Sequence, residues 1–330
     1  MIPLFPTNPS NSAELPNNKQ HQRILGISLL LLLIMFATFI AAMVTNLIGK
    51  LGFGITDNNT IQSMLNNPIH EAQNINFLRI TNISTSLISL GIPALITAII
   101  CGWSPIKIGQ YNIAPSPLNF GLAILAALSL TPVVSFINQI NHWIINKYFS
   151  LNWIQLFGNL NQNRQRIIEA TLDMEKPLEL VVCVLILAFL PALLEEFVFR
   201  GLIQRFLFNQ YKKPWISLVF QGFIFSLIHF SPYEFFSIWT AGIFLGYWMY
   251  KTQSLWQTTL IHFLFNATSI VAHYITLQKF NKSGIYLNFE EIFTQPIWVA
   301  CSMITLTVTL RWLIKTEIKR IKTPSSSELY

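Results

Sequence analysis

Long apolar runs without charged side chains dominate the pattern of this sequence. The run 24–48 contains no charged residue, and about 20 apolar residues suffice to cross a bilayer as a helix. A soluble core helix of this length would carry a polar face, which this run lacks. We therefore interpret 24–48 as a membrane-spanning helix.

Further runs of the same character follow along the chain. Because only helices and closed barrels satisfy the backbone within lipid, and the runs have helical length, they predict an all-α fold. The architecture expected is a polytopic transmembrane helix bundle of about eight spans. The runs cover 24–48, 84–102, 118–138, 178–204, 214–230, 235–250, 254–275 and 296–314.

Polar segments between the runs divide the chain into four regions. Residues 1–23 are polar and rich in Asn and Pro, which predicts a disordered tail. Residues 24–177 hold the first transmembrane helices and an amphipathic loop, and residues 178–275 form a core region with its own polar motifs. Residues 276–330 comprise the last transmembrane helix and a basic C-terminal tail.

The amphipathic stretch 141–158 has two interpretations. Trp143, Tyr148 and Trp153 are interleaved there with Asn and Lys. This pattern is typical of a helix that lies at the membrane interface with aromatic anchors. A packed loop of the membrane domain would show the same composition.

Composition and charge support a membrane protein and exclude nucleic-acid binding. Hydrophobic residues make up 52% of the chain and charged residues 11%, against about 25% charged in a soluble domain. The net charge of +7 comes from basic residues in short loops and in the C-terminal tail, where membrane lipid is the expected partner. No basic stripe suits nucleic acid. A small Lys and Arg excess predicts that both termini are cytoplasmic.

Ionisable side chains inside apolar runs are costly and therefore mark candidate functional residues. This sequence places them in three neighbouring runs, 178–204, 214–230 and 254–275. The motifs are Glu195-Glu196-x-x-x-Arg200, Phe225-x-x-x-His229 and His262-x-x-x-Asn266. Three predicted helices thus offer carboxylates, imidazoles and an amide at similar depth, a combination that suits acid–base catalysis.

Helical spacing indicates how these side chains are oriented. Glu196 and Arg200 are four residues apart, so they share a helix face and we expect them to pair. Glu195 lies about 100° further round the helix and is freer to face a cavity. His262 and Asn266, also four apart, project together from one helix.

Two backbone features accompany the motifs. Pro191 leaves the carbonyl of Leu187 without its helical donor, which predicts a kink just before the glutamate pair. Gly242 and Gly246 form a small-xxx-small spacing that lets helices approach closely in lipid, and we interpret it as a packing motif.

The polar residues also have less specific interpretations. A Glu–Arg pair in a membrane helix is often only an internal salt bridge, and buried Glu, His and Arg can form the proton relay of a transporter. A non-catalytic membrane scaffold is a third possibility. The polar residues gather in three adjacent helices without a second, similar half, which disfavours a carrier. A scaffold has no need of a free glutamate beside two histidines.

The three motifs together resemble the type II CAAX prenyl endopeptidase family, also called the CPBP or Abi family, which includes the Ras-converting endopeptidases. The family pattern is Glu-Glu-x-x-x-Arg, Phe-x-x-x-His and His-x-x-x-Asn on successive transmembrane helices. All motif positions agree here, and the resemblance makes 178–275 the catalytic core. The ending Phe199-Arg200-Gly201 resembles prokaryotic members.

This resemblance implies an intramembrane endopeptidase that hydrolyses a peptide bond of a membrane-associated protein or peptide. By analogy with the family, Glu195 and His229 activate the attacking water. His262 and Asn266 form the oxyanion hole, and Glu196 and Arg200 are supporting residues. The resemblance implies no cofactor and a location in a prokaryotic cytoplasmic membrane.

Zinc is the mechanistic alternative. Glu195, His229 and His262 could supply three ligands and leave a fourth position open for water. The sequence contains no His-Glu-x-x-His run, and the family resembled is generally regarded as metal-independent. The sequence does not name the substrate.

Overall fold

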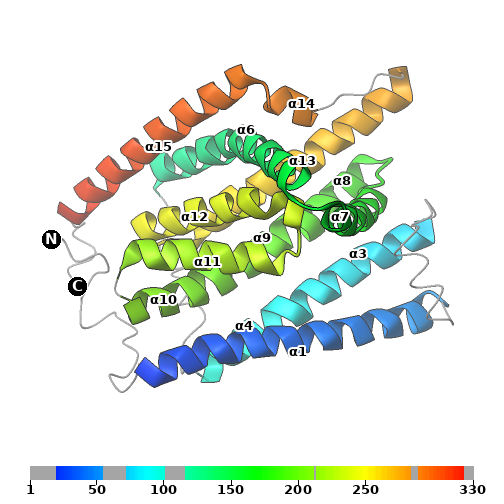
Figure 1. Cartoon of the computed structure of the whole chain (residues 1–330), viewed down its shortest axis with the longest axis horizontal. Coiled ribbons are helices and arrows are strands. Elements are labelled where there is room, and N and C mark those ends of the chain that lie inside the picture. The colour runs from blue at the N-terminus through cyan, green and yellow to red at the C-terminus, as the bar shows by residue number, and fades with distance from the viewer. Residues whose placement is uncertain (1–19, 55–71, 101–115, 212, 284–288, 323–330) are drawn as a thin grey trace.

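The structure is a computed structural model that describes residues 20–54, 72–100, 116–211, 213–283 and 289–322. Every regular element in these ranges is a helix (Figure 1), so the predicted all-α fold is confirmed. Most of the predicted disordered tail, residues 1–19, lies outside the described residues.

Within the described residues each of the eight apolar runs forms helix, and six of the helices there are long and apolar enough to cross a membrane. These six are Gly26–Gly52, Ile75–Ile100, Pro117–Tyr148, Pro177–Phe208, Leu255–Phe280 and Pro296–Thr316. The other two runs form α11 (Pro214–Ile228), a shorter apolar helix, and α12 (Phe235–Thr252).

The helices run roughly along one axis, which lies horizontally in Figure 1. α6 (Pro117–Tyr148), α11, α12 and α13 (Leu255–Ser283) fill the middle of the bundle. On one side α15 (Pro296–Lys322) packs against α6, and α14 (Phe289–Phe293) precedes it. On the other side lies α1 (Gln20–Gly52) with α3 (Ala72–Ser86), η1 (Leu87–Gly91) and α4 (Ile92–Ile100).

The start of α1 and the end of α15 lie at the same end of the bundle (Figure 1). This arrangement agrees with an even number of passes. It also agrees with the expectation that both termini share one side of the membrane. That this side is the cytoplasm stays a prediction.

The helix that carries the glutamate pair alternates between two hydrogen-bonding patterns. It runs through α8 (Pro177–Cys183), η2 (Val184–Phe189), α9 (Leu190–Glu196), η3 (Phe197–Ile203) and α10 (Gln204–Tyr211). Both η2 and η3 are π-helical, with N–H groups that donate to the carbonyl five residues back.

A π-helical segment stands where the sequence predicts a kink. Pro191 cannot donate a backbone hydrogen bond, and η2 ends two residues before it. The N–H of Leu190 reaches the carbonyl of Leu185. The backbone irregularity therefore occurs at the expected place, as a change of helix type directly ahead of the proline.

The Gly242 and Gly246 motif packs helices together, as predicted. A Cβ atom added at Gly242 would lie 2.9 Å from the Cα atom of Gly222 on α11. One added at Gly246 would lie 2.6 Å from Nε2 of Gln221. The close approach of α11 and α12 therefore depends on the absence of side chains at these glycines.

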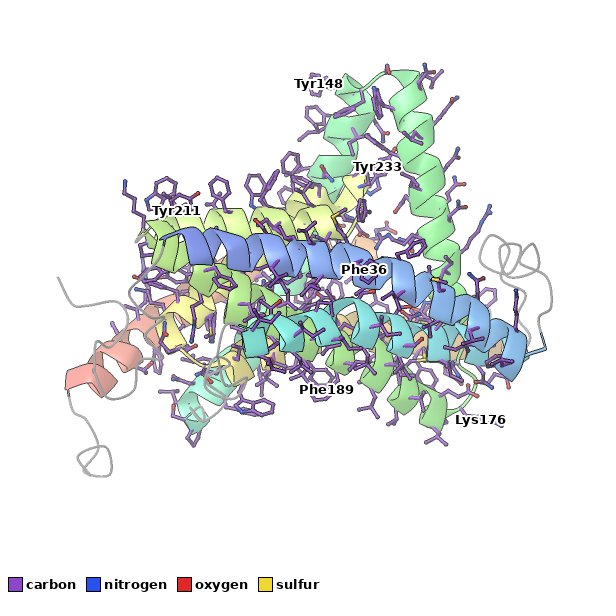
Figure 2. All side chains as sticks on the ribbon, turned by 90° about the horizontal axis from the view of Figure 1, so that it is seen from below. Phe36, Tyr148, Lys176, Phe189, Tyr211 and Tyr233 are labelled. Atoms are coloured by element: carbon purple, nitrogen blue, oxygen red, sulfur yellow. The ribbon has the colours of Figure 1, made fainter. Side chains whose placement is uncertain are left out.

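The amphipathic stretch 141–158 is neither a single helix nor a loop. α6 continues to Tyr148, the chain turns at Phe149 and Ser150, and α7 (Leu151–Thr171) begins. α7 is seen end-on in Figure 1. In Figure 2, where the view is turned by 90°, the end of α6 and α7 form a hairpin that extends beyond the bundle.

Candidate active site

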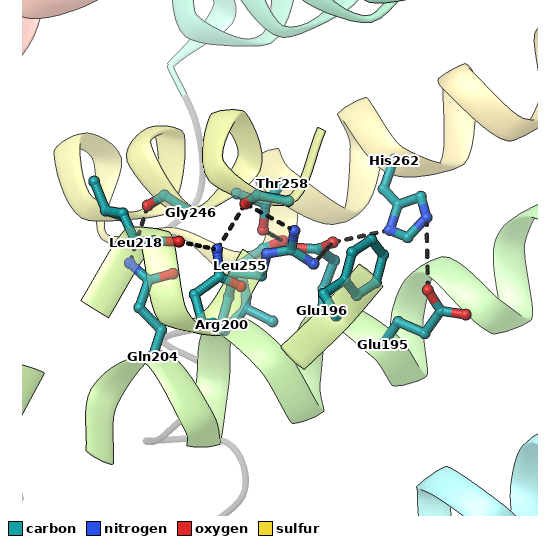
Figure 3. Close-up of polar contacts among 12 residues, drawn as sticks. Glu195, Glu196, Arg200, Gln204, Leu218, Gly246, Leu255, Thr258 and His262 are labelled. Carbon is teal, nitrogen blue, oxygen red and sulfur yellow. Dashed lines mark hydrogen bonds and ion pairs between the residues drawn. The ribbon is translucent and has the colours of Figure 1, made fainter. Parts of the chain in front are cut away.

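Glu196 lies at the centre of a fully buried group of polar side chains (Figure 3). Nη1 of Arg200 donates to its Oε1 atom at 2.7 Å, which confirms the predicted pairing. Nη2 of Arg200 donates to the carbonyl of Gly242 at 3.2 Å, and the guanidinium lies 4.8 Å from the ring centre of Phe225. One arginine thus ties the motif helix to α11 and α12.

His262 contacts the same carboxylate. Its Nδ1 atom lies 2.8 Å from Oε1 of Glu196. An ionised carboxylate only accepts hydrogen bonds, so Nδ1 carries the hydrogen. In neutral His262, Nε2 is then the acceptor. The sequence did not predict this contact, because it joins α9 and α13 across 66 positions in the chain.

His229 is oriented by the end of its own helix. It is the C-cap residue of α11, and its Nδ1 atom lies 2.7 Å from the carbonyl oxygen of Phe225. That oxygen can only accept, so Nδ1 donates and the neutral ring has its acceptor at Nε2. The next residue, Phe230, has a left-handed backbone (φ 46°) that ends the helix.

Glu195 faces both histidines. Its Oε2 atom lies 3.9 Å from Nε2 of His229 and 3.8 Å from Nε2 of His262. These separations are too long for direct hydrogen bonds but suit a bridging water. Among the described residues, Oε2 of Glu195 has no hydrogen-bond partner. A water between Oε2 of Glu195 and either histidine nitrogen can donate a hydrogen bond to each of them.

Asn266 lies at a cavity shared by the two histidines. The cavity has a volume of about 160 Å³, enough for several waters or a small substrate group. It is lined by Leu130, Val134, Phe225, His229, Ile238, Ala241, Leu245, His262, Phe265 and Asn266. The structure thus brings both histidines and the asparagine to one mostly apolar chamber. Glu195 does not line it and lies beyond the histidines.

The three side chains proposed as zinc ligands converge without forming a metal site. Within the described ranges, no group of three or more His, Cys, Asp or Glu side chains is arranged to hold a metal ion. The zinc alternative therefore gains no support from the geometry.

Two buried glutamines support the site and were not predicted. Nε2 of Gln204 donates to the carbonyl of Gly246 at 2.9 Å. Nε2 of Gln221 donates to the carbonyl of Gly242 at 2.7 Å. The only indication in the sequence was an amide within each apolar run, which is too common a feature to identify a partner.

A comparison with protein-family models finds a match for the segment that carries these residues. Residues 177–268 match the family model for Rce1-like type II CAAX prenyl endopeptidases. This segment belongs to the Rce1-like CAAX endopeptidase family. The match includes every residue of the three motifs and supports a membrane protease that acts on a peptide or protein substrate. No curated protein and no solved structure matches the chain.

Proposed function

We propose that this protein is an intramembrane endopeptidase that uses Glu195 and His229 to activate water. The observation that carries the proposal is the convergence of Oε2 of Glu195 with the Nε2 atoms of His229 and His262, beside a cavity. Within an Rce1-like CAAX endopeptidase domain, this arrangement supplies a base, a place for the nucleophile and a place for the substrate.

Attack by water is the first chemical step of the proposal. A water between Glu195 and His229 gives a proton to one of them while its oxygen bonds to the scissile carbonyl carbon. The same group later delivers the proton to the leaving amine, so the step balances without a further reactant.

His262 and Asn266 accept the charge that develops on the carbonyl oxygen. To donate from Nε2, His262 must carry protons on both nitrogens, because Nδ1 is directed at Glu196. The Glu196 carboxylate stabilises that imidazolium, much as the aspartate of a catalytic triad stabilises its histidine. Asn266, one helical turn further along α13, supplies its side-chain N–H to the same oxyanion.

A cleavage assay in liposomes tests the function. Purified protein is mixed with membrane-anchored peptides, and the products are identified by mass spectrometry. Glu195→Gln is expected to lower turnover by about 10²–10⁴-fold, whereas Glu175→Gln, at an exposed position before α8, keeps the activity. If no peptide is cleaved, and Glu195→Gln instead abolishes a proton-coupled flux, the protein is a carrier.

Two further arms of this assay separate the mechanisms. Chelator-stripped protein is expected to remain active, whereas a zinc enzyme would lose activity and regain it with added metal. Asn266→Ala should lower kcat by about 10²–10³-fold with little change in KM, because its amide acts only on the transition state. A rise in KM at constant kcat would instead make Asn266 a substrate-binding residue.

We also propose that the protein lies in a prokaryotic cytoplasmic membrane with both termini in the cytoplasm. α11 begins near the end of the bundle where α1 starts and ends about halfway along α1 (Figure 1), with His229 as its C-cap residue. Reporter fusions at Ser10 and Ser326 should both give cytoplasmic signals. Two external signals would overturn this orientation.

A further inference from the structure

α7 lies across the bundle at the level where two central helices end. Figures 1 and 2 show it perpendicular to the spans. Arg164 of α7 forms an ion pair with Glu234 in η4 (Pro232–Glu234), the turn that joins α11 to α12. α11 and α12 belong to the bundle, so α7 lies beside the bundle at the level where these two helices end. Since it is perpendicular to the spans, α7 runs parallel to the plane of the membrane.

One face of α7 is apolar in the N-terminal half of the helix and again at Ile167, with Arg164 between. Trp153, Leu156, Phe157, Leu160 and Ile167 recur at the i, i+3, i+4 and i+7 spacing of an amphipathic helix. The opposite face carries polar side chains throughout. These are Asn152, Gln155, Asn159, Gln162, Asn163 and Arg166.

The protein covers only one half of this apolar face. Near the C-terminal end of α7, Ile167 packs against Phe77 and Leu78 of α3. In the N-terminal half, Leu156 is 47% exposed and Leu160 is 50% exposed. The same stripe that contacts the bundle thus continues beyond it, and a row of exposed apolar side chains requires a partner.

We propose that lipid at the membrane interface covers the N-terminal half of α7 together with the end of α6. The aromatic residues Trp143, Tyr148 and Trp153 are exposed on this hairpin, as expected of side chains that anchor at the headgroup level. The Lys147 ammonium lies 4.5 Å from the ring centre of Trp143, and its polar end can reach the headgroups from there.

The proposed contact between α7 and lipid depends on apolar burial rather than on charge. Between its ends α7 contains two arginines, Arg164 and Arg166, and one glutamate, Glu169, so it carries little net charge. Arg164 is already engaged with Glu234. A neutral bilayer is therefore a sufficient partner, because interfacial binding scales with the apolar area buried.

The docked helix is connected to the candidate site. Glu234 accepts a hydrogen bond from Ser231 at 2.9 Å, and Ser231 lies two residues after His229. Asn141 near the end of α6 donates to the carbonyl of Pro232 at 2.8 Å. The hairpin thus holds the segment that follows His229. The lipid contact itself does not depend on the proposed peptidase activity.

Spin labels on the two faces of α7 test the proposal. Cys101 and the exposed Cys301 are replaced by serine, and the buried Cys183 stays. Single cysteines then replace Leu156, Leu160, Asn159 or Gln162, and the protein is placed in phosphatidylcholine vesicles. Collisions with oxygen, which concentrates in lipid, and with a water-soluble nickel chelate are measured for each label.

The expected result is opposite behaviour on the two faces. Labels at Leu156 and Leu160 should collide mainly with oxygen, and labels at Asn159 and Gln162 mainly with the nickel chelate. Equal nickel accessibility at all four positions would overturn the proposal. Shielding from both probes at Leu156 and Leu160, with dipolar broadening of the spectrum, would overturn it in favour of a second copy of this chain. Thermal unfolding of each labelled protein confirms that the fold is intact.

Discussion

Two regions of this bundle use different physical means to associate within a membrane. Buried polar groups link the motif helix to its neighbours, through Arg200 to Gly242 and through His262 to Glu196. On α1, Thr38 and Asn46 instead donate within their own helix, to the carbonyls of Ile34 and Ala42. Apolar surface gains little from association in lipid, so hydrogen bonds and close packing must provide specificity.

The difference indicates which region must hold a fixed geometry. α1 presents Met35, Phe36 and Phe39 outward, each more than half exposed, and small residues such as Ala41 inward. Such a helix can tolerate small rotations, because no charge is left unpaired when it moves. In the polar region, a similar rotation would separate Glu196 from both Arg200 and His262. We expect this region to be the more rigid and the less tolerant of substitution.

The largest effect on stability is expected from Glu196→Gln. This change leaves the buried Arg200 guanidinium without its counter-charge, at a cost of about 3–5 kcal/mol of folding free energy. Unfolding by SDS titration in mixed micelles measures it. The double variant Glu196→Gln with Arg200→Met should recover part of the loss, since no buried charge remains. A stable but inactive Glu196→Gln protein would move Glu196 from a supporting to a chemical role.

An intermediate effect is expected from Gly242→Ala. The added methyl group meets the backbone of Gly222 on α11, and overpacking of this kind costs about 1–3 kcal/mol. Gly121→Ala in α6 is the matched control, since nothing lies within 4 Å of its added Cβ atom. There the higher helix propensity of alanine should raise stability by about 0.5–1 kcal/mol. Equal effects at the two glycines would show that α11 and α12 are not closely packed.

The smallest effect is expected from Phe36→Leu on the outer face of α1. This side chain is 64% exposed in the isolated chain and is expected to contact lipid. The change in folding free energy should stay within about 0.5 kcal/mol, measured by the same titration. A loss comparable to that of Gly242→Ala would mean that α1 has a specific protein partner at this face.

Local spacing in the sequence predicted local structure well. The apolar runs located the helices, and the i, i+4 relation of Glu196 to Arg200 located the ion pair, because both depend only on helix geometry. The close packing at Gly242 was predicted for the same reason. Pro191 marked the backbone irregularity because a missing donor is visible in the residue type itself.

Relations between helices could not be predicted in this way. The bond from Glu196 to His262 depends on how α9 and α13 pack, which no spacing within either helix encodes. The two-part structure of 141–158 depends on a turn at Phe149 and Ser150, where neither residue is a strong helix breaker. The catalytic roles of Glu195 and Asn266 are likewise proposals, supported by their placement.

The π-helical winding of η3 allows three side chains to share one line. Glu196, Arg200 and Gln204 recur every fourth residue, and an α-helix would rotate each about 40° past the previous one. The slower winding of a π-helix offsets that rotation, so Arg200 and Gln204 reach carbonyls of α12 that are also four residues apart. The number of residues in the segment Phe197–Ile203 therefore matters as well as their identity, because it sets the spacing of these side chains along α12. Deleting a single residue there would shorten the spacing between two of these side chains, so that Arg200 and Gln204 could no longer both reach carbonyls four residues apart on α12. A deletion should consequently do more damage than any substitution at the same position.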